Sequence, residues 1–218
     1  MKRLLMVSAL LLTQACVYQQ GDAAVRLLGI LPMEGAECTL GSKPILTGSL
    51  DVSGGTYFLA ALSYESSLVD PEPLELGDRT VPTVSRDIVF KEIVYTYQAE
   101  GVTMPGEEVF PIYLVIRPSD NSDGTVEGVS MLTEAARKAL ATLPVSLTAP
   151  VGKVFVNVQL RGNMTSGTAV STNTITFPLT IYNTGFAPDT GACTAGGSPT
   201  AATEFTCGEP GQGGRICR

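Results

Sequence analysis

Short apolar segments separated by turn residues recur along most of the chain, which is the pattern of an all-β protein. Residues 153–161 and 173–182 show the clearest alternation of apolar and polar positions. Their apolar faces consist of Val154, Val156, Val158 and Leu160 in the first segment and of Ile175, Phe177, Leu179 and Ile181 in the second. Because Pro178 cannot donate a ladder hydrogen bond, we expect the second strand to lie at an edge or to carry a bulge.

Further strands are predicted by weaker patterns of the same kind. The segments are residues 44–52, 56–64, 87–97 and 110–116. The unbroken apolar run at residues 56–64 favours a central strand. Residues 65–85 contain five acids and three prolines, so we expect a loop there. Residues 162–167 predict another loop.

One segment has the composition of a helix. Residues 133–140 are rich in strong helix formers, with Thr133 or Ser130 as the expected N-cap and Pro144 beyond the expected end. A helix in this position would cross between strands.

The apolar pattern stops at residue 187. Of the 32 residues 187–218, seven are Gly and three are Pro. We therefore expect this segment to bury too little apolar surface to offset the loss of conformational entropy on folding. It nevertheless contains three cysteines, which predicts an irregular tail that disulfides link covalently to the end of the last strand.

The first residues have the pattern of an export signal. Lys2 and Arg3 precede a nine-residue apolar segment at residues 4–12. A membrane-spanning helix needs about 20 residues, whereas the h-region of a secretory signal has this shorter length. The segment ends in Leu-Thr-Gln-Ala-Cys at residues 12–16, which resembles the lipobox of bacterial lipoproteins.

The lipobox resemblance implies a signal peptide at residues 1–15 and lipid attachment at Cys16. In that family the thiol carries diacylglycerol and the new amino group is acylated, with palmitate as a typical chain. Val17 stands where aspartate would retain a lipoprotein at the inner membrane, so the resemblance implies the outer membrane. The alternative is a plain signal peptide whose Cys16 forms a disulfide. The expected organisation is a tether at residues 16–24, a β-sandwich domain at residues 25–186 and the tail at residues 187–218.

Composition and charge limit the classes of binding partner that we expect. The net charge is −7, and removal of the signal peptide would change it to −9. An acidic chain does not favour nucleic acid, because nucleic-acid binding relies on Lys and Arg. Hydrophobic residues make up 44% and charged residues 16% of the chain, which predicts a folded domain.

The remaining four cysteines form an even set. In an exported protein they predict two disulfides with three possible connectivities. The sequence contains no C-x-x-C pair, so the set favours disulfides over structural zinc. The expected disulfide residues are Cys38, Cys193, Cys207 and Cys217.

Candidate catalytic motifs are incomplete. The chain has no histidine, which excludes Ser-His-Asp and Cys-His nucleophile systems and histidine metal sites. Residues 128–132 (GVSML) match half of a nucleophile elbow. Residues 189–192 (DTGA) resemble one half of an aspartic protease site, which needs two such aspartates. Residues 120–124 (DNSDG) resemble a calcium loop with the wrong ligand spacing, so a hairpin or crossover turn is favoured over weak calcium binding with Glu127.

Four stretches of the sequence together resemble the sequences of one group of bacterial proteins. They are YFLAALSYESSL from residue 57, VFKEIVYTY from residue 89, VQLRG with TNTITFPLTIY from residues 158 and 172, and the C-terminal C…CG-x-PGQ…C. Residues 53–218 are similar to uncharacterised predicted lipoproteins of myxobacteria-type Gram-negative bacteria. The resemblance implies an immunoglobulin-like β-sandwich at the cell surface and no particular activity. Members usually carry more cysteine just after the final strand, where this chain has only Tyr182, Asn183, Thr184 and Gly185 before it continues to Cys193.

These observations predict a non-enzymatic, lipid-anchored outer-membrane protein with a structural or binding role. We expect no cofactor beyond the covalent lipid, and an envelope protein or a glycan as partner. Binding would use the loops at residues 65–85 or 118–128, or strand addition at a sheet edge. The alternatives are an accessory subunit of an envelope complex, or a glycan hydrolase that uses only carboxylates from residues 65–78 or 120–127.

Overall fold

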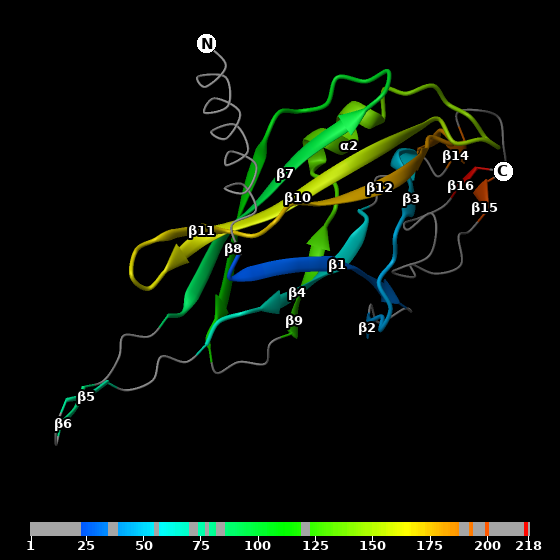
Figure 1. Cartoon of the computed structure of the whole chain (residues 1–218). Coiled ribbons are helices and arrows are strands. Elements are labelled where there is room, and N and C mark those ends of the chain that lie inside the picture. Colours follow the sequence, from blue (N-terminus) through cyan, green and yellow to red (C-terminus); the bar gives the residue numbers. More distant parts are fainter. Residues whose placement is uncertain are drawn as a thin grey trace, which may run out of the picture.

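The structure is a computed structural model that describes residues 23–34, 39–54, 57–69, 74–76, 79–81, 86–118, 123–187, 192–193, 199–200 and 216–217 (Figure 1). Over these residues the chain is mostly β-strand, with curled sheets and one short α-helix. The predicted all-β class with a single short helix is therefore confirmed.

Four antiparallel strands of the described chain form a first sheet in the order β2-β1-β4-β9. They are β1 (Val25–Glu34), β2 (Thr39–Leu40), β4 (Leu59–Ser66) and β9 (Asp123–Ser130). β4 lies between β1 and β9, as its apolar run predicted. Ala60 and Leu62 are buried in the main core, and Ala61 packs with Leu31 and Met33 in a second cluster. Both faces of β4 are therefore covered.

The second sheet has the order β3-β12-β10-β7-β8, with β11 paired to β10. Its strands are β3 (Gly48–Asp51), β7 (Ile88–Ala99), β8 (Glu108–Ile116), β10 (Gly152–Met164), β11 (Ala169–Ser171) and β12 (Ile175–Tyr182). β3 and β12 run parallel, and the other neighbouring strands run antiparallel. The two segments with the clearest alternation are thus β10 and β12, which lie side by side (Figure 1).

One hydrophobic core is shared by the two sheets. The predicted apolar face of β10 is completely buried, since Val154, Val156, Val158 and Leu160 are all 0% exposed. Phe58, just before β4, meets Phe177 of β12 with ring centroids 5.5 Å apart. Full burial of one such side chain stabilises the fold by about 1.5–3 kcal/mol, so these facing rows hold the sheets together.

The helix α2 (Glu134–Leu140) begins after Thr133, whose Oγ1 accepts a hydrogen bond from the Ala136 N–H at 3.1 Å. Ala136 and Leu140 are four residues apart and are both buried, so one face of the helix packs on the core. α2 joins β9 of the first sheet to β10 of the second. The predicted crossover helix and its Thr133 cap are therefore confirmed.

On one side of the molecule, hydrogen bonds join the two sheets. The Asn173 side chain, just before β12, accepts from Leu27 N at 2.7 Å and donates to the Leu27 carbonyl at 3.0 Å. Before β3, Ile45 N donates to the Ile30 carbonyl of β1 at 2.8 Å. We call this region, together with Asp51 at the end of β3, the closed side.

Asp51 is a buried carboxylate, only 1% exposed, with several donors around it. It accepts hydrogen bonds from Thr184 Oγ1 at 2.5 Å, from Ser53 Oγ at 2.6 Å and from Ser53 N at 3.0 Å. Ser53 lies in the 3-10 turn η1 (Val52–Gly54), and Thr184 follows β12. Since a buried charge is tolerated only with such partners, Asp51 fastens the end of β3 to the chain that leaves β12.

The prediction of an unstructured loop at residues 65–85 is wrong in part. β4 continues to Ser66, and a hairpin of β5 (Leu74–Leu76) and β6 (Arg79–Val81) follows. The prolines at positions 71, 73 and 82 flank these two strands rather than interrupt them. Two residues separate the strands, which is the spacing of a tight hairpin.

The loop predicted at residues 162–167 is shorter than expected. β10 continues to Met164, and the chain then turns and returns as β11. Gly162 lies at a register shift between β10 and β7, where a Cβ atom would come within 2.1 Å of the Val89 carbonyl oxygen. Glycine is therefore required by the close approach of β7 and does not mark a loop.

The expectation that Pro178 lies at an edge or at a bulge is right only locally, because Pro178 is free on one side although β12 as a whole is not an edge strand, and no bulge occurs there. β12 lies between β10 and β3, and its pairing with β10 continues through Pro178 without a register shift. The β3 ladder begins only at Leu179. Pro178 therefore has no ladder partner on the β3 side, and its missing N–H is not needed there.

Candidate binding groove

The two sheets separate where β8 and β9 lie. In the described part of the chain no strand bridges these two edges, and a groove of about 360 Å³ lies between them. β8 contributes residues 110–112 and β9 contributes residues 126–130. Successive side chains of a strand point to opposite faces of the sheet. Since consecutive residues of each strand line the groove, the groove lies along the edges of the two strands and not on one face of either. We call this region the open side.

The floor of the groove is aromatic and aliphatic. Ile93 and Tyr95 of β7 are buried beneath it. The Phe110 ring of β8 meets Tyr95 edge-on, with centroids 6.0 Å apart and planes at 71°. Phe110 is 41% exposed, whereas Tyr95 is 4% exposed. The groove therefore presents an apolar surface that is only partly covered by its own chain.

The end wall of the groove is held in place by Thr133. Its N–H donates to Tyr97 Oη at 3.2 Å, and its Oγ1 donates to Glu108 Oε2 at 2.5 Å. Tyr97 belongs to β7 and Glu108 begins β8, so Thr133 ties the start of α2 to the second sheet. Burial raises the pKa of Tyr97 to about 12, so Tyr97 remains a neutral phenol near pH 7.

The charged residues that line the groove are acidic. Glu127 of β9 and Glu134 of α2 both line it, and both are exposed. Glu134 forms an ion pair with Lys138 at 2.6 Å, and the Lys138 ammonium lowers the pKa of Glu134. No ion pair to Glu127 occurs among the described residues. At the rim, Arg137 lies 6.0 Å from the centre of the Tyr57 ring.

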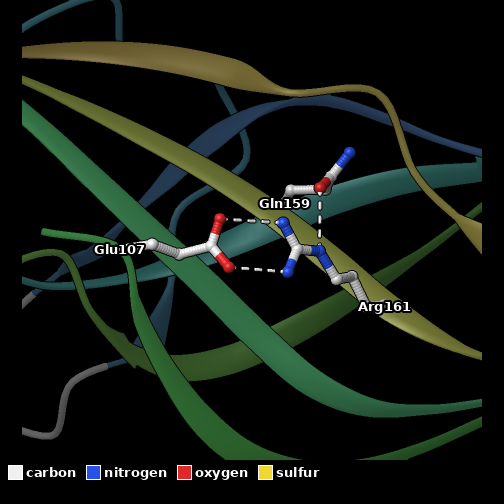
Figure 2. Close-up of polar contacts among 3 residues, drawn as sticks. All are labelled: Glu107, Gln159 and Arg161. Carbon is white, nitrogen blue, oxygen red and sulfur yellow. Dashed lines mark hydrogen bonds and ion pairs between the residues drawn. The ribbon is translucent and has the colours of Figure 1, made fainter.

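An exposed ion pair fastens the β8 edge to the rest of its sheet (Figure 2). The Arg161 guanidinium donates to both carboxylate oxygens of Glu107, at 2.7 and 3.0 Å, and its Nε donates to Gln159 at 3.3 Å. Glu107 directly precedes β8, Arg161 lies in β10, and β7 runs between those strands. The ion pair therefore spans β7.

The structure leaves the predicted cysteine chemistry open. Cys16, Cys38 and Cys207 lie outside the described residues. Cys193 is in β14 (Ala192–Cys193), which pairs with β13 (Phe186–Ala187), and Cys217 is in β16 (Ile216–Cys217), which pairs with β15 (Pro199–Thr200). Lipid attachment and the two disulfides remain predictions.

The predicted acidic candidates are only partly described. Asp70, Glu72, Asp78, Asp120 and Asp189 lie outside the described residues. Glu65 and Asp123 are cross-strand neighbours on β4 and β9. Among the described residues no group of three acids or cysteines could hold a metal ion. Ser130 of the GVSML segment donates its hydroxyl to the Leu132 carbonyl at 2.7 Å, so it supports a local turn.

Most residues of the groove were not singled out in the sequence. The predicted binding segment 118–128 overlaps the groove only at residues 126–128, where the sequence suggests Glu127 as a weak calcium ligand. The sequence pattern places Tyr57, Tyr95 and Phe110 in strands and gives them no other role. A usable signal was present in β8, where apolar residues occupy both faces at positions 109–115, which is unusual for a strand with one buried face.

Comparisons with known proteins give no family assignment. No protein family, curated protein or solved structure matches this chain. In the described part of the chain, no helix is long and apolar enough to cross a membrane.

Proposed function

We propose that this protein is a lipid-anchored outer-membrane protein that binds a partner in the groove between β8 and β9. The role is non-enzymatic, and the partner is a component of the cell envelope. The lipobox-like residues 12–16 support the anchor, with Cys16 carrying diacylglycerol and an N-acyl chain.

The observation that carries the binding role is the partly covered apolar floor of the groove. Phe110 is 41% exposed beside the buried Tyr95, and both edge strands line the opening. An exposed apolar surface with a polar rim is typical of an interaction site. The predicted strand addition at a sheet edge agrees with this location.

For residues 25–186 we propose an immunoglobulin-like sandwich. Its support is the main core that the two sheets share and the crossing of the chain between them at α2. For the tail we propose two disulfides among Cys38, Cys193, Cys207 and Cys217. Peptide mapping without reduction tests them, and free thiols at these positions would contradict the proposal.

Two experiments test the proposed function. Radiolabelled palmitate should enter the wild-type protein and not the Cys16→Ala variant, and equal labelling would exclude the anchor. A photo-crosslinking p-benzoylphenylalanine that replaces Phe110 should capture one envelope component in intact cells. The same probe at Leu46, which is 83% exposed before β3, is the control and should capture none. Equal capture at both positions would contradict a partner site in the groove.

A further inference from the structure

We infer that the groove takes an extended, basic peptide segment, with apolar side chains on the floor and a Lys or Arg beside Glu127. This inference rests on the proposed function, because it specifies the partner of the same groove. It commits to a peptide in preference to a glycan or a second copy of this chain.

The shape of the groove favours an extended chain. Its sides are the edges of two strands, β8 at residues 110–112 and β9 at residues 126–130. A segment lying along such edges alternates its side chains between the groove floor and solvent. The floor of Ile93, Tyr95 and Phe110 would receive apolar side chains, for which burial is favourable.

The two edges are not equivalent for pairing. β8 carries Pro111, which has no N–H to donate, and proline is a common feature of protected edges. β9 has no proline, although Gly128 adopts a positive φ of 69° where the β4 register shifts. Main-chain hydrogen bonds to a peptide therefore favour β9 on either side of Gly128.

Charge selects the kind of peptide. The charged side chains that line the groove are Glu127 and Glu134, and Lys138 already neutralises Glu134. Arg137 lies at the rim over Tyr57, so the attraction for a basic residue is local to Glu127. A basic residue beside Glu127 would complete an ion pair at the rim. The negative net charge of the chain, −9 without the signal peptide, would also attract a basic partner over longer distances.

The probe is a fluorescein-labelled peptide, Lys-Thr-Val-Lys-Val-Thr-Val-Lys, titrated with the full-length protein in detergent and followed by fluorescence anisotropy. A matched peptide with Glu in place of each Lys is the control. We expect the wild type to bind the Lys peptide more tightly than the Glu peptide. Glu127→Lys should weaken the Lys peptide by about tenfold or more and reverse this preference, because like charges then face each other.

Two further variants identify the groove as the binding site. Phe110→Ser should abolish binding, whereas Tyr113→Ser should not change it, since Tyr113 is 82% exposed and does not line the groove. Circular dichroism and a thermal melt would check that each variant is folded. Absence of binding to the wild type, or an affinity that does not respond to Glu127→Lys, overturns the inference.

The outcome also separates this inference from the proposed function. If the probe at Phe110 captures an envelope component but the Lys peptide does not bind, the groove remains a partner site and the basic peptide is wrong. If neither is seen, the proposed function fails as well. A dimer in sedimentation velocity that Phe110→Ser dissociates would assign the groove to a second copy and would also overturn the inference.

Discussion

The closed side and the open side are the two places where an edge of one sheet faces an edge of the other, and their chemistry differs. On the closed side, polar groups are paired across the gap, as in the two hydrogen bonds between Asn173 and Leu27. On the open side, Thr133 makes hydrogen bonds across the end of the gap, but the floor is apolar and Phe110 remains 41% exposed.

The difference separates stability from binding within one small domain. A buried polar group such as Asp51 costs free energy unless its partners are present, so its hydrogen bonds fix one arrangement of the chain. A half-exposed aromatic ring can gain contacts without losing any. We therefore expect substitutions on the closed side to affect unfolding and substitutions on the open side to affect partners.

The largest effect is expected for Asp51→Ala. The change removes the acceptor of Thr184 Oγ1 and Ser53 Oγ and leaves these donors in a largely buried environment. The free energy of unfolding should fall by about 3 kcal/mol, as for other buried hydrogen-bond networks. Urea denaturation followed by circular dichroism measures it. Asp51→Asn keeps one acceptor oxygen and should lose less, and a loss equal to that of Asp51→Ala would show that the stabilisation requires the whole carboxylate.

A smaller loss is expected for Asn173→Ala. Leu27 N and the Leu27 carbonyl would both lose their side-chain partner, although nearby water can replace part of it because Asn173 is exposed. We expect a decrease of about 1.5 kcal/mol in the same urea experiment. Asn173→Asp is the matched control, since it keeps the acceptor for Leu27 N and removes the donor. An unchanged midpoint in Asn173→Ala would mean that the closed side is held by its core residues alone.

Strands with strict alternation were predictable from the sequence. The buried faces of β10 and β12 follow directly from their apolar positions, and the Thr133 cap follows from the helix-forming run after it. β9 was not recognised, because two glycines interrupt its pattern. Gly124 is needed where the Tyr64 ring covers it, since a Cβ atom would lie 2.3 Å from that ring, and Gly128 adopts a positive φ. A tertiary contact therefore explains Gly124, and the backbone conformation at the register shift with β4 explains Gly128.

The groove was less predictable than the fold. Its sides come from residues 110–112 and 126–130, whose strands belong to different sheets. Strand addition at an edge was a reasonable expectation, but the sequence does not tell which strands are edges. That depends on the pairing order, which places β8 and β9 last in their sheets within the described chain. The side chain of Phe110 looks like an ordinary core residue until that order is known.

The smallest effect is expected for the ion pair between Glu107 and Arg161, which ties the β8 edge to β10 (Figure 2). Both side chains are substantially exposed, so solvent weakens the interaction, and Glu107→Gln should shift the urea midpoint only slightly at pH 7. The hydrogen bonds from Arg161 hold the pKa of Glu107 below its ordinary value of 4.5.

The sign of the pH dependence follows from this lowered pKa. A carboxyl whose pKa is lower in the folded state contributes stability above its unfolded pKa and loses it as the pH falls through the folded pKa. The difference between wild type and Glu107→Gln should therefore be present at pH 7 and vanish as the pH falls below 4.5. Added salt should reduce it at pH 7, because exposed charges are screened. A stability difference between wild type and Glu107→Gln that persists in acid and in high salt would show that Glu107 acts through packing. The open side would then contribute to stability through its own contacts, as the closed side does.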